Sequence, residues 1–306
     1  MRFLILFLLG MTLACASIAQ TQYTSLKPAE MIRESKSAGK NFIKTTLFER
    51  ATEKKNVDGA LSEYESLTLD IEKLQQLVSG APQQLNFKLP SNQRNESEFE
   101  LELVQVDIFD SNFAVMESST NQPVDIERGL HFRGIIKGDQ NSLVAVSIFE
   151  DEVTGLISSG STGNLVLARL NQKNNQQEYV LYNDKDVVEQ LGSYCDTPDD
   201  GPAYTREQLE YTQPGDRGPG DCVRIYFEVD NDIYADKGGT NGATNYITSI
   251  FNQSATLYAN ENISLVISEV FVWNTASPYS GSSSGTLLTQ FQGYRTGFNG
   301  DLAQLV

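Results

Sequence analysis

Between residues 64 and 182, short runs of alternating apolar and polar residues follow one another along the chain. Alternation with a period of two places the apolar side chains on one face, which predicts a series of β-strands. Turn-forming residues such as Gly138-Asp139 separate the runs, so the connections are expected to be tight. Many short strands with tight connections favour an antiparallel sandwich or rolled sheet. The expected strands span residues 64–69, 85–89, 99–109, 114–116, 130–137, 142–150, 152–158, 164–169 and 178–182.

One short helix is expected within this strand-rich region. Asp70 stands where an N-cap residue belongs, apolar residues follow it at helical spacing, and Gly80 marks the expected end. The residues before the first strand, Ser25 to Lys55, are mostly polar and are expected to be loosely held.

The pattern changes downstream of residue 222, where strands alternate with helices. The expected order is strand, helix, strand, helix, strand, which predicts part of a three-layer α/β domain with right-handed crossovers. The expected elements are strands over 223–229, 263–273 and 302–306, a helix over 243–260, and a second helix around residues 287–291. The expected buried face of the first helix carries Ile247, Ile250, Phe251, Leu257 and Tyr258.

A stretch rich in proline, glycine and acidic residues, from about Asp199 to Asp221, separates the two regions and is interpreted as an exposed linker. The predicted division of the chain is an export signal over 1–19, a β-rich region over 20–205, a linker over 206–221 and an α/β region over 222–306. Because Leu305-Val306 lies inside an apolar strand, we expect the α/β region to continue beyond it.

The amino terminus has the pattern of a secretory signal peptide. Arg2 gives it a positive start, an apolar stretch begins at Phe3, and Ser17-Ile18-Ala19 offers small residues for cleavage after Ala19. A buried or membrane helix is the alternative, but the stretch is shorter than the roughly 20 residues that a membrane span needs. We therefore expect a secreted protein that has no membrane association once the signal is removed.

Charge and cysteine content limit the classes of partner. The net charge of −17 and the pI near 4.5 would repel phosphate backbones, so nucleic acid is not an expected partner. Cys195 and Cys222 remain after signal removal, too few for a disulfide scaffold but able to pair outside the cell.

Ordered stretches on both sides of the linker resemble one protease family. Those downstream are residues 229–234, 251–253 through 257–258, 263–265 leading to 271–273, and 301–305; those upstream are 131–134, 141–147 and 155–157. The downstream set resembles the start of the catalytic domain of reprolysin-type (adamalysin-like, metzincin) zinc metallopeptidases, especially secreted bacterial members. The upstream set resembles the pro-region of the same family, and the resemblance spans roughly Tyr64 to Val306.

The resemblance implies a zinc endopeptidase zymogen that acts on proteins or peptides. Residues 20–205 would be a pro-region that assists folding and inhibits the enzyme, and residues 222–306 would be the first half of an α/β zincin-type catalytic domain. The family binds zinc through an H-E-x-x-H-x-x-G-x-x-H helix. This sequence has one histidine, His131. The zinc ligands are therefore expected beyond residue 306, and this chain alone is expected to be inactive.

Three interpretations stay open for the two cysteines. Cys195 could be an inhibitory thiolate at the fourth zinc position, Cys195 could pair with Cys222, or Cys222 could pair with a cysteine beyond residue 306. In the linker, Arg217-Gly218 is the preferred activation cut, because exposed Pro/Gly-rich segments admit processing proteases.

Two further patterns have structural interpretations that are favoured over chemical ones. The segment 281–285 matches G-x-S-x-G, but no histidine follows it, so a serine-rich loop is expected. Asp230, Asp232 and Asp236 are spaced as in a calcium loop, but Tyr234 interrupts them and no closing glutamate follows. Arg224 stands where many animal relatives carry a calcium-binding glutamate, so calcium is not an expected cofactor.

A different class of function is a noncatalytic secreted β-rich binding or adhesion protein. Tyr258, Phe271 and Trp273 could form a binding face for such a role, but at strand and helix spacing they are expected in the core. His131 lies in a strand pattern and is expected to be partly buried rather than a lone ligand. An H-E-x-x-H-x-x-G-x-x-H run within roughly 80 residues past Val306 would favour the enzyme.

Overall fold

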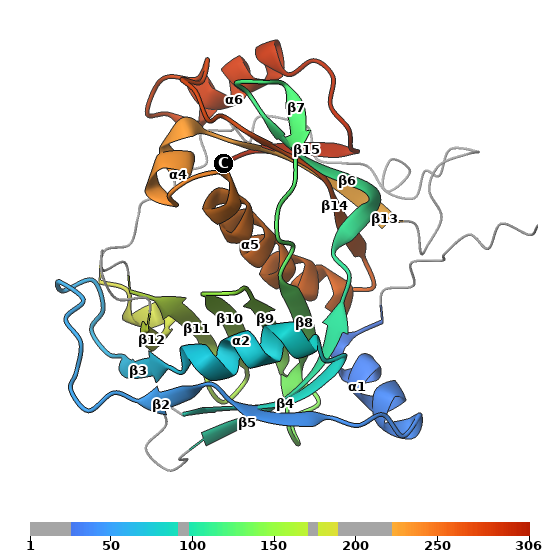
Figure 1. Cartoon of the computed structure of the whole chain (residues 1–306), viewed down its shortest axis with the longest axis vertical. Coiled ribbons are helices and arrows are strands. Elements are labelled where there is room, and N and C mark those ends of the chain that lie inside the picture. The colour runs from blue at the N-terminus through green and yellow to red at the C-terminus, as the bar shows by residue number, and fades with distance from the viewer. Residues whose placement is uncertain (1–25, 91–97, 171–176, 189–221) are drawn as a thin grey trace, which may run out of the picture.

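The structure is a computed structural model that describes residues 26–90, 98–170, 177–188 and 222–306. This part of the chain is β-rich and forms a ten-stranded sheet and a five-stranded sheet, with a long helix between them (Figure 1). The β-rich prediction for the upstream region is therefore confirmed. No helix in the described ranges combines the length and the apolar character that a membrane crossing requires.

The ten-stranded sheet is built from the upstream region, in the order β1-β4-β5-β8-β9-β10-β11-β12-β3-β2. Neighbouring strands are antiparallel except for β1 and β4, which are parallel. Because β2 also lies against β4, the two ends of the sheet approach each other and the sheet is rolled. The strands are β1 Ile43–Thr46, β2 Phe48–Arg50, β3 Glu65–Leu69, β4 Gln84–Pro90, β5 Glu98–Val106, β8 Leu130–Ile136, β9 Leu143–Ile148, β10 Val153–Ser159, β11 Gly163–Arg169 and β12 Glu178–Asn183.

Helix α2 (Ile71–Gly80) packs Leu74 and Leu77 into the core of this rolled sheet. The Asp70 side chain caps it as predicted, accepting a hydrogen bond of 3.0 Å from the Lys73 amide. The left-handed residue that ends the helix is Ala81, one position after Gly80. A 3-10 turn, η1 (Asp184–Asp186), follows β12.

The prediction that Ser25 to Lys55 is loosely held is wrong for the residues described. Helix α1 (Pro28–Ser37) buries Ile32, and β1 and β2 form the two ends of the rolled sheet. Leu47 and Phe48 are fully buried in its core. A few widely spaced apolar residues hold this polar segment in place. They are too few to form a periodic pattern that would predict its helix and strands.

The downstream region forms β13 (Cys222–Val229), α4 (Asn231–Asp236), α5 (Thr240–Asn260), β14 (Ser264–Val272), α6 (Ser284–Tyr294) and β15 (Leu302–Leu305). The expected alternation of strands and helices is confirmed, with α4 as an additional short helix. Strand β13 ends at Val229, and Asp230 caps α4 by accepting a hydrogen bond of 2.6 Å from the Asn231 amide. Strands β15, β13 and β14 are parallel.

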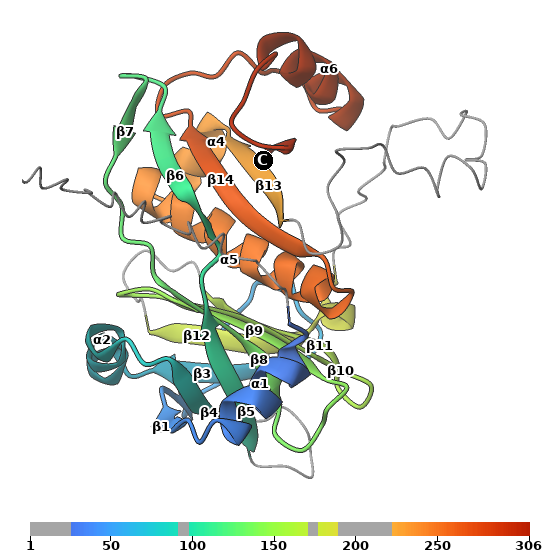
Figure 2. The same cartoon turned by 90° about the vertical axis from the view of Figure 1, so that its right-hand side faces the viewer.

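Two strands of the upstream region complete the five-stranded sheet, whose order is β15-β13-β14-β6-β7. Strand β6 (Phe109–Glu117) pairs in parallel with β14, and β7 (Gln122–Val124) pairs antiparallel with β6. Residues 107–129, which we call the arm, thus leave the ten-stranded sheet between the paired strands β5 and β8 and return to it (Figure 2).

The prediction of one continuous strand over 99–109 is wrong, because the chain changes sheets within it. Strand β5 ends at Val106, and the Asp107 carboxylate accepts a hydrogen bond of 3.0 Å from the Phe109 amide. This local Asp turn redirects the backbone into the arm. The alternating pattern alone does not reveal it, because both sheets bury the same kind of side chain.

Helix α5 lies between the two sheets and contacts β8, β9 and β10 on one side and β14 on the other (Figure 1). Ile247 and Phe251 of the expected buried face are buried. Ile250, Leu257 and Tyr258 are exposed, so that part of the prediction is wrong. The helix instead buries a second, polar side that includes Thr248, Asn252 and Thr256.

Gly134 lets β8 approach β5 closely at the base of the arm. A β-carbon at this position would lie 1.8 Å from the Glu102 carbonyl oxygen, and backbone cannot move away as a side chain can. Gly134→Ala is expected to lower the free energy of unfolding by about 2 kcal/mol or more, as judged from the cost of overpacking. Urea denaturation measures this. Gly80→Ala is the control, because nothing lies within 4 Å of its added carbon; equal effects of the two would contradict the close approach.

Candidate functional site at the junction of the two sheets

The arm binds β14 through parallel strand pairing that is interrupted by a bulge between Ile267 and Glu269. Phe109 pairs with Ile267, Val115 with Val270 and Glu117 with Val272. Main-chain hydrogen bonds run to the Ile108 carbonyl from the Ile267 amide (2.8 Å), and to the Val272 carbonyl from the Ser118 amide (3.0 Å). The edge of β14 is therefore satisfied by the upstream region.

Both regions contribute to one hydrophobic core around this pairing. The arm supplies Ile108, Phe109, Phe113 and Val115. Burying each such side chain contributes roughly 1.5–3 kcal/mol, so the arm supplies much of the core's stabilisation. The downstream region supplies Phe227, Val229, Ala243, Ile247, Phe251, Ala255, Ile267, Val270 and Val272.

Polar contacts fix both ends of the arm. Near its tip, Asn274 accepts hydrogen bonds of 2.9 Å from the Ser118 hydroxyl and the Ser119 amide, and the Thr240 hydroxyl donates to Glu117. Near its base, the Asp110 carboxylate forms an ion pair of 3.0 Å with Arg224 on β13.

A buried polar network joins α5 to the ten-stranded sheet. The Asn252 side-chain oxygen accepts a hydrogen bond of 3.1 Å from Nε of Arg133 on β8, whose side chain is buried. The Asn252 amide nitrogen lies 3.3 Å from both the Phe132 carbonyl and the Ser147 hydroxyl, and donates toward them. Burial lowers the pKa of Arg133 to about 10, and an electrostatic interaction with Cys222 partly offsets this.

His131 extends this network and uses both ring nitrogens. Nε2 lies 3.0 Å from the Arg128 carbonyl, which can only accept, so Nε2 carries the proton. Nδ1 then accepts from the Ser147 hydroxyl at 3.0 Å. The ring also packs edge-on against Phe109 of the arm and Phe149. His131 is more deeply buried than expected and acts as a structural member of the junction.

Acid is expected to destabilise the protein through His131. Burial lowers its pKa from 6.5 to about 4, so below pH 6.5 the unfolded chain binds a proton that the folded chain excludes. Stability from this group therefore falls as the pH drops from 7 toward 4, by about 2 kcal/mol at pH 5. Urea denaturation at pH 7 and pH 5 checks this: His131→Asn should show a shallower loss than the unsubstituted chain. Equal losses would contradict the assignment.

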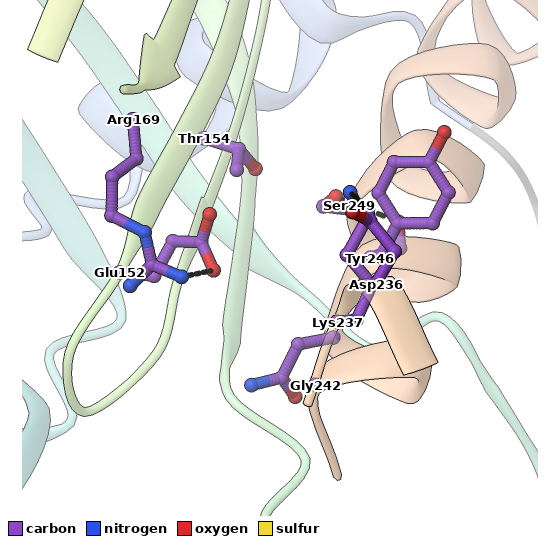
Figure 3. Close-up of a pocket in the computed structure, with 9 residues that line it drawn as sticks. Glu152, Thr154, Arg169, Asp236, Lys237, Gly242, Tyr246 and Ser249 are labelled. Atoms are coloured by element: carbon purple, nitrogen blue, oxygen red, sulfur yellow. Dashed lines mark hydrogen bonds and ion pairs between the residues drawn. The ribbon is translucent and has the colours of Figure 1, made fainter. Parts of the chain in front are cut away.

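A polar pocket of about 150 Å³ opens at one end of the junction, between β10 and β11 on one side and α4 and α5 on the other (Figure 3). Glu152 forms an ion pair of 3.2 Å with Arg169 across its sheet side. Burial raises the pKa of Glu152. Thr154 Oγ1 and Asn245 Oδ1 are buried without a hydrogen-bond partner. The lining can hold polar solutes or water, and its side chains include neither cysteine nor histidine.

A buried carboxylate, Glu228 on β13, organises the other end of the downstream region. It accepts hydrogen bonds from the Trp273 ring nitrogen (2.7 Å) and the Tyr279 hydroxyl (2.5 Å) at one oxygen, and from Tyr226 (2.9 Å) and Arg295 Nε (2.5 Å) at the other. Burial alone would raise its pKa, but the donors on Arg295, Tyr279 and Trp273 together hold the pKa of Glu228 below its ordinary value. Glu228 was not among the predicted site residues, because its only signal in the sequence is a charged residue inside a largely apolar strand.

Three of the sequence-predicted site residues, Ala19, Cys195 and Arg217, lie outside the described ranges. The signal cleavage, the inhibitory thiolate, the disulfide and the activation cut therefore stay predictions. Cys222 begins β13, with its sulfur 4.0 Å from the Val223 carbonyl.

The remaining candidates take structural roles. Arg224 forms the ion pair with Asp110 described above and donates a hydrogen bond of 2.6 Å to Asn299. A guanidinium therefore stands where the resemblance places a calcium-binding glutamate in many animal relatives. Asp232 bonds the Ile233 amide, and Asp236 bonds the neighbouring lysine. In the serine-rich segment, Ser283 caps α6. Phe271 and Trp273 are buried as predicted, whereas Tyr258 is exposed.

The described residues do not fit a three-histidine zinc centre. No group of three or more histidine, cysteine, aspartate or glutamate side chains with metal-binding geometry occurs in the described ranges. His131 has both nitrogens engaged, as described above. No chemical step through zinc can therefore be assigned to these residues.

Comparison with known proteins does not establish a family. No protein family model matches the chain, and no curated protein sequence does. Among solved structures, the chain is similar to the crystal structure of metalloproteinase-II from Bacteroides fragilis, at 11% sequence identity and a TM-score of 0.39. The match covers 76% of this chain and 66% of that one, just under two thirds of its length. A likeness at this level identifies neither a family nor an activity.

Proposed function

We propose that the chain is the amino-terminal part of a secreted zinc-dependent endopeptidase zymogen. Residues 20–205 are its pro-region, residues 222–306 open its catalytic domain, and its zinc ligands lie beyond residue 306. The peptidase assignment is supported by the ordered sequence resemblance. The role of the pro-region is supported by one structural observation: the arm supplies two strands to the sheet that the downstream region builds.

The arm gives the pro-region a physical means to assist folding. Without β6, the edge of β14 would expose unpaired amide and carbonyl groups, together with apolar residues such as Ile267 and Val270. Such an edge favours aggregation. A catalytic domain made with its pro-region attached avoids that exposure while the rest of its sheet forms.

The complete reading frame and its full-length product test the peptidase assignment. We expect an H-E-x-x-H-x-x-G-x-x-H run within roughly 80 residues past Val306. The processed full-length protein should digest casein, and chelation or a Glu→Gln change in that motif should abolish the activity. The 306-residue chain should show neither activity nor stoichiometric zinc. A frame without clustered histidines, or digestion that survives chelation, would overturn the assignment in favour of a noncatalytic protein.

Amino-terminal sequencing of the secreted products tests the processing sites. We expect the zymogen to begin at Gln20 and the activated enzyme at Gly218. An activated enzyme that begins well before Asp199 or after Val229 would contradict the proposed boundary.

A further inference from the structure

The arm is needed by one sheet and not by the other. In the ten-stranded sheet, β5 and β8 pair directly from Leu101 with Ile136 to Val106 with His131, so this sheet is continuous without the arm. In the five-stranded sheet, the arm pairs with β14 at Ile267 and again from Glu269 to Val272. We call the described residues before position 189 the upstream unit and residues 222–306 the downstream unit. The arm therefore behaves as a strand that the upstream unit donates to the downstream unit (Figure 2).

The contacts between the two units do not involve the segment that joins them in sequence. They include the parallel strand pairing, the shared hydrophobic core, the Arg133–Asn252 hydrogen bond and the Asp110–Arg224 ion pair. None of these residues belongs to the segment 189–221, which joins the two units in sequence. Val115 of the arm is 1% exposed, which places it at the centre of the shared core.

We propose that the upstream unit stays bound to the downstream unit after the joining segment is cut, held by the arm as an added strand on β14. This inference rests on the proposed function only for the identity of the cut as an activation step. A cut between residues 189 and 221 then produces a two-piece complex and does not release the upstream unit. Release requires a second event that unpairs or destroys the arm. Interfaces of this kind, with a shared core, resemble obligate ones.

The binding mode is strand addition with a defined partner. Main-chain hydrogen bonds give such contacts their affinity, and alternate side chains give their specificity. In the arm, Phe113 and Val115 point to the core at alternate positions, whereas Asn112 is exposed. The occupant that fits the β14 edge is thus the chain's own upstream unit, supplied in cis before the cut and as a separate piece after it.

Site-specific cleavage of the 306-residue chain tests this proposal. A recognition sequence for a specific protease is inserted between residues 199 and 221, and the cut chain is analysed by size-exclusion chromatography at submicromolar concentration. A reductant is present, so that a disulfide between Cys195 and Cys222 cannot hold the pieces together. We expect both pieces to elute together. Separation of the pieces on dilution would overturn the proposal.

Two matched variants locate the contact. Val115→Asp places a charge in the shared core and should cause the pieces to separate, or the downstream piece to precipitate, after the cut. Asn112→Asp adds the same charge at an exposed position of the same strand and should leave co-elution unchanged. The upstream piece of Val115→Asp should keep the circular dichroism of a folded β-sheet, because its own sheet does not use the arm. Co-elution that survives Val115→Asp would overturn the role of the arm, whatever the reading frame encodes.

Discussion

Asn252→Leu is expected to lower the free energy of unfolding by about 3 kcal/mol, because it leaves the buried Arg133 guanidinium without its Asn252 acceptor. The substitution also removes the donors to Phe132 and Ser147. These groups lie between α5 and the ten-stranded sheet, so the loss should fall on the junction of the two units. Urea denaturation measures it.

Two comparisons separate a broken network from a change of volume. Asn245→Leu is the matched control, because Asn245 is buried on the same helix but its side-chain oxygen has no partner. It should cost much less than Asn252→Leu. The double variant Arg133→Met, Asn252→Leu should recover part of the loss, because removing both partners is cheaper than orphaning one. Equal costs at Asn245 and Asn252 would contradict the network.

Glu228→Ala is expected to have the second large effect, a loss of about 3–5 kcal/mol, because it leaves Arg295 without its carboxylate in a largely buried cluster. Three further donors, on Tyr226, Trp273 and Tyr279, lose their acceptor at the same time. The variant should unfold at a lower urea concentration, and β13 should lose its ion pair with Arg295, the residue that follows α6.

A control variant and the pH dependence of stability both test the role of Glu228. Glu261→Ala removes an exposed carboxylate of the same unit and should change the free energy of unfolding by less than about 0.5 kcal/mol. Because its folded-state pKa lies below the ordinary value of 4.5, Glu228 stabilises the protein above that pH and loses this contribution as the pH falls further. Similar losses in Glu228→Ala and Glu261→Ala would contradict the buried network.

The sequence predicts those helices and strands well that depend on nearby residues, such as a helix cap or an alternating run. Asp70 before an apolar helical spacing gives α2, and alternation gives β8 to β12 with errors of one or two residues at their ends. The signals fail where partners are distant in sequence. Nothing in residues 109–117 distinguishes a strand of the upstream sheet from one that crosses to β14, because alternation reports a buried face and not the neighbour.

For the same reason, the contacts between α5 and the ten-stranded sheet could not be predicted from the sequence. Asn252 and Ser147 are common residues at unremarkable positions, and their roles arise only when α5 packs on β8 and β9. Helix α5 buries two sides, so the single apolar face expected from its pattern misplaces Ile250 and Tyr258. His131 was identifiable as a residue in a strand, but its partners were not.

Hydrogen–deuterium exchange of β14 tests most directly whether the arm is an integral strand of the downstream sheet. In the unsubstituted chain, the amides of residues 264–272 that face β6, such as that of Ile267, should exchange as slowly as those of β9 in the middle of the ten-stranded sheet. In Val115→Asp, exchange should accelerate in β14 while β9 stays protected. Rapid exchange of β14 in the unsubstituted chain, or protection unchanged by Val115→Asp, would contradict the account.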